Sequence, residues 1–434
     1  MKNIENIILD ILKKHPEISG YKLVTLSRKS RELFLIKDKL DLNRGKTSVN
    51  YTLTVYVEFT EDGEKYLGSA SIRLAPTLSA DEIERKIVFA HSQALSVKTK
   101  WYPLAKPSSA TLINPTSDIE PSALGDTIEK IATAILSAKG KTARINSAEV
   151  FLTMKETHLC NSNGVDVSYT NIENKIEVIT SCDGEHESVE VYGDAHYANC
   201  SIPQIKELVE QQLLETENRS IAQKSKHIEN IPVILRNSSV SSFFSFFVDQ
   251  TSGGSVFHQA SRAEVGKNFQ GENIAGDLLT ITLKPFLENA SASEPFDKDG
   301  FVLKPIKIFD KGVVKQIHAD LQMAHYLHIE PTGFIPCFEV ECGSVSYDEM
   351  LAKPHVEIFR FSDFLCDPVT GDFGGEFRLA KYFDGEKTHI IHNGAISANI
   401  FAVQKEFYFS KERMQENSYL GPKAILIPGL TISG

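Results

Sequence analysis

Residues 361–399, with the sequence FSDFLCDPVTGDFGGEFRLAKYFDGEKTHIIHNGAISAN, are the most informative stretch of this chain. Short runs in which apolar and polar side chains alternate, such as Phe377 to Phe383, are typical of strands with one buried face. These runs are separated by residues typical of tight reversals: Asp367-Pro368, Gly371, Gly374-Gly375, Asp384-Gly385 and Asn393-Gly394. The stretch therefore predicts an antiparallel meander in which the last two pairs form hairpins. Such a sheet offers a flat face or a free edge to another molecule.

The first half of the chain has helical patterns interleaved with further strand patterns. Ile4, Ile7, Ile8 and Ile11 have helical spacing, and Ser79 with Glu82 forms a capping box at the start of a second helix. Further helices are predicted over residues 126–138 and 202–217. Strands are predicted over residues 21–27, 32–41, 50–59, 66–74, 148–151, 165–169, 175–180 and 188–192. Two turns are predicted between these strands, at Asn43-Arg44-Gly45 and at Glu61-Asp62-Gly63.

These patterns predict an α+β protein with two domains. A chain of 434 residues is longer than one hydrophobic core usually serves. Residues 1–230 are expected to form an antiparallel sheet with packed helices. Residues 231–434 are expected to form a β-rich domain, barrel-like or sandwich-like. The Pro- and Ser-rich segment 103–121 is expected to be a surface connection, with a lid or partner-contact loop as the alternative.

Composition limits the class of partner. The net charge of −11 argues against nucleic acid, because affinity for phosphates comes from clustered Lys and Arg. No GxGxxG or GxxxxGK[ST] phosphate cradle occurs, and no apolar run is long enough to span a membrane. The six cysteines include no CxxC pair, which favours reduced thiols in a cytoplasmic protein.

Several motifs resemble the TldD/PmbA family, which is often labelled "modulator of DNA gyrase" and includes metallopeptidases. The strongest are DPVTGDF at residues 367–373, HNGAISANI at residues 392–400 and the C-terminal run at residues 421–434. Weaker matches are NSNGV at residues 161–165, IPVIL at residues 231–235, and residues 261–267. The acidic charge gives no support for direct DNA binding.

The stretch NSSVSSFFSFFVDQTSGGSV, residues 237–256, departs from the catalytic branch of that family. The resemblance implies a helix there that carries HExxxH, whose histidines bind zinc and whose Glu polarises the zinc-bound water. Here the stretch has no histidine, residues 410–434 have neither Cys nor His, and His186-Glu187 lacks a second histidine. The chain thus resembles the PmbA (TldE-like) branch. The resemblance implies that this chain has no cofactor, is inactive alone, and that zinc is held by a TldD-like partner subunit.

A different metal site is the alternative. His318, His325 and His328 would share one side if they lay on a single helix, but a packing helix with histidines at its margin is the favoured interpretation. His389 and His392 would point to opposite faces of a strand. The segment Cys182–His186 is expected to be a solvated turn. Cys337 and Cys342 are expected on opposite faces of one strand, where the neighbouring glutamates oppose a reactive thiolate.

The apolar face of residues 237–256 is interpreted as core, with a subunit or peptide contact as the alternative. The residues on it are Phe243, Phe244, Phe246, Phe247 and Val248.

Three functions remain open from the sequence. The first is a non-catalytic subunit of a TldD/PmbA-type complex that acts on unfolded peptides, which bind by strand addition. The second is a metallopeptidase with the three histidines as ligands. The third is a homodimeric peptide-binding or scaffold protein without a proteolytic role. The residues expected to contact peptide or partner are Asp367, Gly371, Asp372, Phe373, Asn393 and Gly394.

Overall fold

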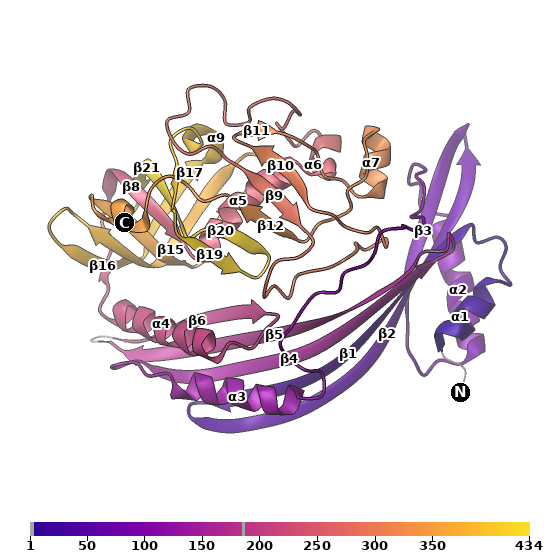
Figure 1. The fold of residues 1–434 in the computed structure, drawn as a ribbon, viewed down its shortest axis with the longest axis horizontal. Coiled ribbons are helices and arrows are strands. Elements are labelled where there is room, and N and C mark those ends of the chain that lie inside the picture. Colours follow the sequence, from indigo (N-terminus) through magenta and orange to yellow (C-terminus); the bar gives the residue numbers. More distant parts are fainter. Residues whose placement is uncertain (1–3, 185–186) are drawn as a thin grey trace.

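The computed structural model describes residues 4–184 and 187–434. A long curved antiparallel sheet from the first half of the chain lies beneath a β-rich body from the second half (Figure 1). The sheet order is β3-β2-β1-β4-β5-β6. Its strands are β1 (Gly20–Ile36), β2 (Lys39–Glu61), β3 (Glu64–Leu74), β4 (Arg144–Asn161), β5 (Asp166–Asp183) and β6 (Ser188–Tyr197). The predicted α+β class is confirmed.

The strands of this sheet are longer than the sequence patterns predicted. Residues 21–27 and 32–36 belong to one strand, β1, and residues 166–169 and 175–180 belong to β5. The predicted turn at Asn43-Arg44-Gly45 is wrong, because these residues lie inside β2 opposite β1. The reversal occurs instead at Lys37, which has a φ of 58°. Arg44 forms an ion pair with Glu32 on the opposite strand, so its side chain helps to hold β1 and β2 together. The reversal at Asp62 and Gly63 is confirmed.

The helices of the first half cover one face of this sheet. They are α1 (Ile4–Leu12), α2 (Ala80–Ala94), α3 (Leu124–Ser137) and α4 (Ile202–Ser220). The capping box of Ser79 and Glu82 is present at the start of α2. α1 and α2 pack against one end of the sheet around Leu53, while α3 and α4 pack against the other end around Val150. The helices therefore form two apolar cores on one sheet.

The opposite face of the sheet meets the second half of the chain. Lys22 of β1 lies 2.6 Å from the carboxylate of Asp299, and Tyr169 of β5 packs edge-on against Phe296. Residues 101–123, which we call the strap, cross the structure between the two halves (Figure 1). The strap is more than a surface connection, because Ala105 and Ile119 are buried.

Two sheets form the β-rich second half. One has the order β11-β10-β9-β12-β20-β19, and the other has the order β18-β21-β8-β13-β15-β16-β7, with β14 and β17 also paired to β15. The strands of the first are β9 (Ile281–Lys284), β10 (Ile306–Asp310), β11 (Val313–Val314), β12 (Cys337–Val340), β19 (Arg413–Glu416) and β20 (Tyr419–Pro422). Those of the second are β7 (Gln223–Lys224), β8 (Ile228–Arg236), β13 (His355–Phe361), β14 (Leu365–Cys366), β15 (Asp372–Phe383), β16 (Thr388–His392), β17 (Gly394–Asn399), β18 (Tyr408–Phe409) and β21 (Ala424–Ile432).

Helix α5 lies between these two sheets (Figure 1). The remaining helices are short: α6 (Gly253–Phe257), α7 (Leu321–Leu327), α8 (Tyr347–Leu351) and α9 (Ile400–Val403), while α5 spans Ser238–Gln250. The phenylalanines of α5 join apolar side chains of both sheets in one cluster. Phe243 packs against Phe373 with ring centroids 5.2 Å apart, and Phe247 packs against Phe309. The interpretation of this helix face as core is confirmed.

The meander of residues 361–399 forms as predicted, with one exception. The loop at Asp384 and Gly385 joins the paired strands β15 and β16. Asn393 and Gly394, however, do not form a hairpin, because β16 and β17 pair one after the other with the same strand, β15. Asn393, with a φ of 54°, is a kink between two collinear strands. Gly394 is required beside Phe377, whose ring carbon would lie 2.4 Å from an added Cβ.

The expected domain boundary between residues 230 and 231 stays a prediction. Both β7 and the first residues of β8 precede it and pair with strands of the second half. The polar segment after α4 is thus already part of the second half's sheet.

Candidate functional site

The polar face of α5 is the side that does not enter the core. Ser241, Ser245 and Asp249 follow one another at intervals of four residues, so they lie on one side of the helix. Phe243, Phe244, Phe246 and Phe247 are 0–1% exposed on the other side. The helix therefore presents hydroxyls and one carboxylate outward while its aromatic rings hold it between the sheets.

This polar face lines a cavity of about 480 Å³. The other walls come from α6, from the start of α7 and the segment leading into it, from residues 333–336 before β12, and from Phe338 in β12. The lining residues are Ser245, Val248, Asp249, Ser252, Gly253, Gly254, Leu283, His318, Ala319, Asp320, Met323, Gly333, Phe334, Ile335, Pro336, Phe338 and Ser418. Serine recurs along this face in the sequence of residues 237–256. The residues opposite these serines come from distant segments that no sequence pattern links to α5.

Two carboxylates reach this cavity, and they differ in their partners. Asp320 caps α7 by accepting the Met323 N–H at 2.9 Å, and its other oxygen lies 3.0 Å from Lys298 Nζ. The carboxylate of Asp249 has no hydrogen-bond or ion-pair partner among the described residues. Burial raises the pKa of Asp249, although its side chain remains open to water, because the surrounding walls displace part of its solvent.

The three histidines of the alternative metal site do not share a helix. His318 lies before α7 and is buried, with its Nε2–H donating to the Val248 carbonyl at 3.0 Å. Burial lowers the pKa of His318, so this side chain is held neutral. His325 is in the last turn of α7 against Trp101, and His328 ends the helix in a left-handed conformation. The premise of a common helix face is wrong, because the helix begins only at Leu321.

The residues beside α5 do not fit the zinc site of the catalytic branch. Zinc requires several nitrogen, sulfur or carboxylate ligands that converge on one point. Serines and the single carboxylate of Asp249 occupy the outward face of α5 instead. Within residues 4–184 and 187–434, no group of three His, Cys, Asp or Glu side chains is arranged to hold a metal ion.

The predicted contact residues fall into two places. Asp367, Gly371, Asp372 and Phe373 form one turn at the end of α5, where Gln250 donates to the Pro368 carbonyl. Asp367 accepts the N–H groups of Val369 and Thr370, and these bonds lower the pKa of Asp367.

Two residues of this turn are tied to the rest of the sheet. Asp372 accepts from the Asn399 side chain at 2.7 Å, while Phe373 is buried in the core. Asn393 and Gly394 are not part of this turn. Gly394 begins β17 and pairs with Phe377, at a position farther along β15 from the turn.

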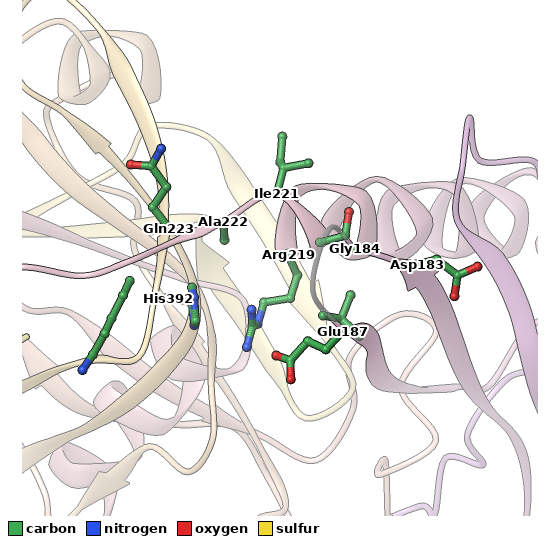
Figure 2. Close-up of a pocket in the computed structure, with 11 residues that line it drawn as sticks. Asp183, Gly184, Glu187, Arg219, Ile221, Ala222, Gln223 and His392 are labelled. Atoms are coloured by element: carbon green, nitrogen blue, oxygen red, sulfur yellow. The ribbon is translucent and has the colours of Figure 1, made fainter.

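A second cavity, of about 600 Å³, lies where α4 ends beside β7 and β16. Figure 2 shows Arg219 extending from α4 and His392 on the neighbouring strand. Its charges are mixed, because Asp183 and Glu187 also line it. Residues 185 and 186 lie outside the described part of the chain. The predicted Cys182–His186 turn and the His186-Glu187 pair both include one or both of these residues. We therefore assign no site there.

The cysteines do not form a reactive centre in the described chain. All six are free thiols. Burial raises the pKa of Cys337 to about 12, so its thiolate is not accessible at neutral pH. Cys342 lies beyond the end of β12, which corrects the prediction that both cysteines share one strand.

Comparison with known proteins gives the same fold over the whole chain. A solved structure from Bacteroides thetaiotaomicron, described as a modulator of DNA gyrase, superimposes with a TM-score of 0.81 at 19% identity and covers 100% of this chain and 99% of that one. TldE from Thermococcus kodakarensis superimposes with a TM-score of 0.78 at 16% identity, covering 100% of both chains. At these identities the likeness establishes the fold. None of the described helices is long and apolar enough to cross a membrane.

Sequence comparison places the second half of the chain in a family. An uncharacterized protein of Methanocaldococcus jannaschii is 24% identical over 171 residues, which are 36% of this chain and 40% of that relative. The chain thus matches about two fifths of that relative's length. Residues 228–434 match the family described as "PmbA/TldA metallopeptidase C-terminal domain". The motifs at residues 367–373 and 392–400 lie within this match. Residues 228–434 of the chain therefore belong to the TldD/PmbA family.

Proposed function

We propose that this chain is a non-catalytic, PmbA- or TldE-like subunit of a TldD/PmbA-type metallopeptidase complex that acts on unfolded peptides. The observation that carries the proposal is the character of α5. In a family described as metallopeptidase, this helix directs serines and one carboxylate into an open cavity and has no histidine. Zinc would be held by a partner subunit that carries HExxxH, and this chain would help to hold the peptide.

A free sheet edge beside the cavity supports peptide binding by strand addition. Within the described residues, β19 is an edge strand whose backbone pairs with β20 alone. The turn that follows β19 reaches the cavity at Ser418. Ser241 of α5 donates to Glu416, so the polar face of α5 begins where β19 ends. An extended peptide paired with β19 would therefore continue along the polar face of α5.

Exposed apolar side chains around the Asp367 turn support a partner contact. Leu365 is 66% exposed and Val369 is 51% exposed on either side of Asp367. Apolar side chains at an outward turn are typical of residues that become buried on association. In this proposal the turn from Asp367 to Phe373 is positioned by α5 and contacts the zinc-bearing subunit. The Asn393 kink has a supporting role, because it aligns β17 with that turn.

The experiment is reconstitution of the complex. The pure chain is assayed for zinc by plasma mass spectrometry and for cleavage of an unfolded peptide, alone and with a TldD-like HExxxH protein. We expect no zinc and no cleavage for the chain alone, and chelator-sensitive cleavage by the co-purified pair. One zinc per chain with chelator-sensitive cleavage by the chain alone would overturn the proposal. Stable homodimers that bind peptide but no zinc-bearing subunit would favour the scaffold function.

The contact surface has its own test. We expect the double change Leu365→Asp and Val369→Asp to abolish co-purification with the zinc-bearing subunit, because two charges would be buried in an apolar contact. The matched control is Ile113→Asp in the strap, since Ile113 is 66% exposed far from this turn in the sequence. Equal loss of complex in both variants would contradict the assignment of the turn.

A further inference from the structure

The cavity beside α5 combines apolar walls with one charged group. Phe334, at its rim, is 62% exposed, which is unusual for a large aromatic side chain. Met323 and Val248 line the same cavity. Gly254 leaves room beside them, because an added Cβ there would meet only the Ser252 hydroxyl, at 3.9 Å. The walls are therefore suited to the methylene stem of a long side chain.

The charge in this cavity is unbalanced. Asp320 is already satisfied by the α7 amide and by Lys298. Asp249 has no cation within ion-pair distance among the described residues, and the other polar residue of its own helix that lines the cavity is Ser245. A carboxylate that lines a cavity, remains open to water and has no cation among the lining residues can pair with a cation from outside the chain.

A metal ion does not suit this arrangement. Divalent cations require several converging carboxylate, imidazole or thiolate ligands, and no such group of three is present in the part of the chain that the structure describes. An organic cation needs only one carboxylate, a few hydroxyl acceptors and apolar walls. The volume of about 480 Å³ is within the range of small-ligand pockets.

We propose that this cavity receives one Lys or Arg side chain of the bound peptide, with the cationic head at Asp249 and the stem against Met323 and Phe334. The Ser245 hydroxyl, one helical turn before Asp249, is placed to accept a second hydrogen bond. This inference rests on the proposed peptide-binding function and adds to it a preference for a basic residue. A peptide that follows the polar face of α5 from β19 reaches the cavity with one side chain.

The test uses two fluorescein-labelled peptides of ten residues that are identical except at one central position. One carries Lys and the other carries Met, which has a similar stem without the charge. Binding to the full chain, or to the complex if it forms, is followed by fluorescence anisotropy. We expect tighter binding of the Lys peptide by roughly tenfold, since a charge-assisted hydrogen bond replaces lost hydration.

Two variants identify the group responsible. Asp249→Asn is expected to remove the preference for Lys and to leave binding of the Met peptide unchanged. Asp249→Lys is expected to prefer a third peptide with Glu at the same position, which a merely structural role would not produce. The matched control is Asp348→Asn, an exposed carboxylate at the start of α8. Thermal unfolding of each variant verifies that it is folded.

The outcomes separate this inference from the proposed function. Equal binding of the Lys and Met peptides by the unchanged protein would overturn the basic preference and leave peptide binding standing. A preference that survives Asp249→Asn would overturn the assignment to Asp249. Failure of every peptide to bind would overturn the peptide-binding function, and this inference would fall with it.

Discussion

Helices α4 and α5 are both amphipathic, but they meet their surroundings in opposite ways. α4 buries polar groups: Gln212 donates to the carbonyls of Val178 and Val191, and Thr216 bonds to Thr180. α5 buries phenylalanine rings and directs its polar groups into a cavity. The buried polar groups of α4 find partners within the chain, whereas the carboxylate of α5 has none among the described residues.

The difference indicates which helix is structural and which faces a ligand. A buried polar group that lacks a partner is costly, so a helix that serves only the fold has its polar groups paired. α4 also ties the two halves of the chain together, because Glu215 lies 2.6 Å from Arg360 of β13. The Asp249 carboxylate is open to water and is not paired within the described residues, so it is available to a separate molecule. The following changes test this contrast, from the largest expected effect to the smallest.

Phe247→Ala is expected to have the largest effect. The ring is fully buried and contacts Phe243, Phe309 and Phe407, so truncation leaves a cavity between both sheets. We expect a loss of about 3–5 kcal/mol in the free energy of unfolding, measured by urea denaturation. Phe89→Ala on α2 is the control, because Phe89 is 60% exposed and should change stability by less than about 0.5 kcal/mol. Similar losses in both variants would contradict the core role of α5.

Arg360→Ala is expected to have the next largest effect on the free energy of unfolding. It leaves Glu215, whose side chain is 5% exposed, without its cation. We expect a loss of about 2–3 kcal/mol, less than for a fully buried pair because Arg360 is itself 30% exposed. Arg378→Ala, which breaks an exposed pair with Glu376, should cost less than about 0.5 kcal/mol by the same urea denaturation. If Arg360→Ala also costs so little, α4 does not tie the two halves together.

Thr216→Val removes one buried hydroxyl from α4 at nearly constant volume. The Thr216 hydroxyl donates to the Gln212 carbonyl at 2.8 Å and lies 2.6 Å from the Thr180 hydroxyl. We expect a loss of about 1 kcal/mol in the free energy of unfolding, measured by thermal denaturation. Thr133→Val on α3 removes the same kind of bond, to the Glu129 carbonyl at 2.8 Å, from an exposed position. Equal effects at the two sites would mean that burial adds nothing to the bond in α4.

Asp249→Asn is expected to have the smallest effect on stability, a gain of no more than about 0.5 kcal/mol at pH 7. The folded chain raises the pKa of Asp249 above its ordinary value of 3.8, so the folded state binds more protons than the unfolded state above that pH. The contribution of Asp249 to the stability of the unchanged protein therefore falls as pH rises from 3.8 through the folded pKa. The variant lacks this decline.

Urea denaturation from pH 3.5 to 7 measures that difference. The advantage of Asp249→Asn should be absent at the acidic end and grow with pH. An advantage that shrinks as pH rises would mean that Asp249 has a cationic partner in the folded chain. α5 would then resemble α4, and the ligand-binding interpretation would lose its basis.

The sequence was most informative where a local rule decides the structure. The capping box at Ser79, the reversal at Asp62 and Gly63, and the phenylalanine face of α5 are all confirmed, because each depends on residues within a few positions of one another. The prediction at Asn43-Arg44-Gly45 is wrong because long-range pairing overrides a local turn preference. These residues continue β2 opposite β1, with Arg44 held by Glu32.

The kink at Asn393 shows the same limit. Asn-Gly favours a positive φ, and Asn393 has one, but the sequence cannot show whether the chain then reverses or continues. Here β15 is long enough to pair with β17 and then with β16, so the chain continues. The partner strand decides the outcome.

The sequence by itself determined the α+β class, the family and the absence of histidine from the α5 stretch. These follow from periodicity, turn residues and motifs that are local in the chain. Only the tertiary structure placed Asp249 in a cavity without a cation, moved His318 away from the helix of His325, and joined α4 to β13 through Glu215 and Arg360. The physical reason is that burial and charge pairing depend on groups from distant segments, which only the folded chain brings within a few ångströms of one another.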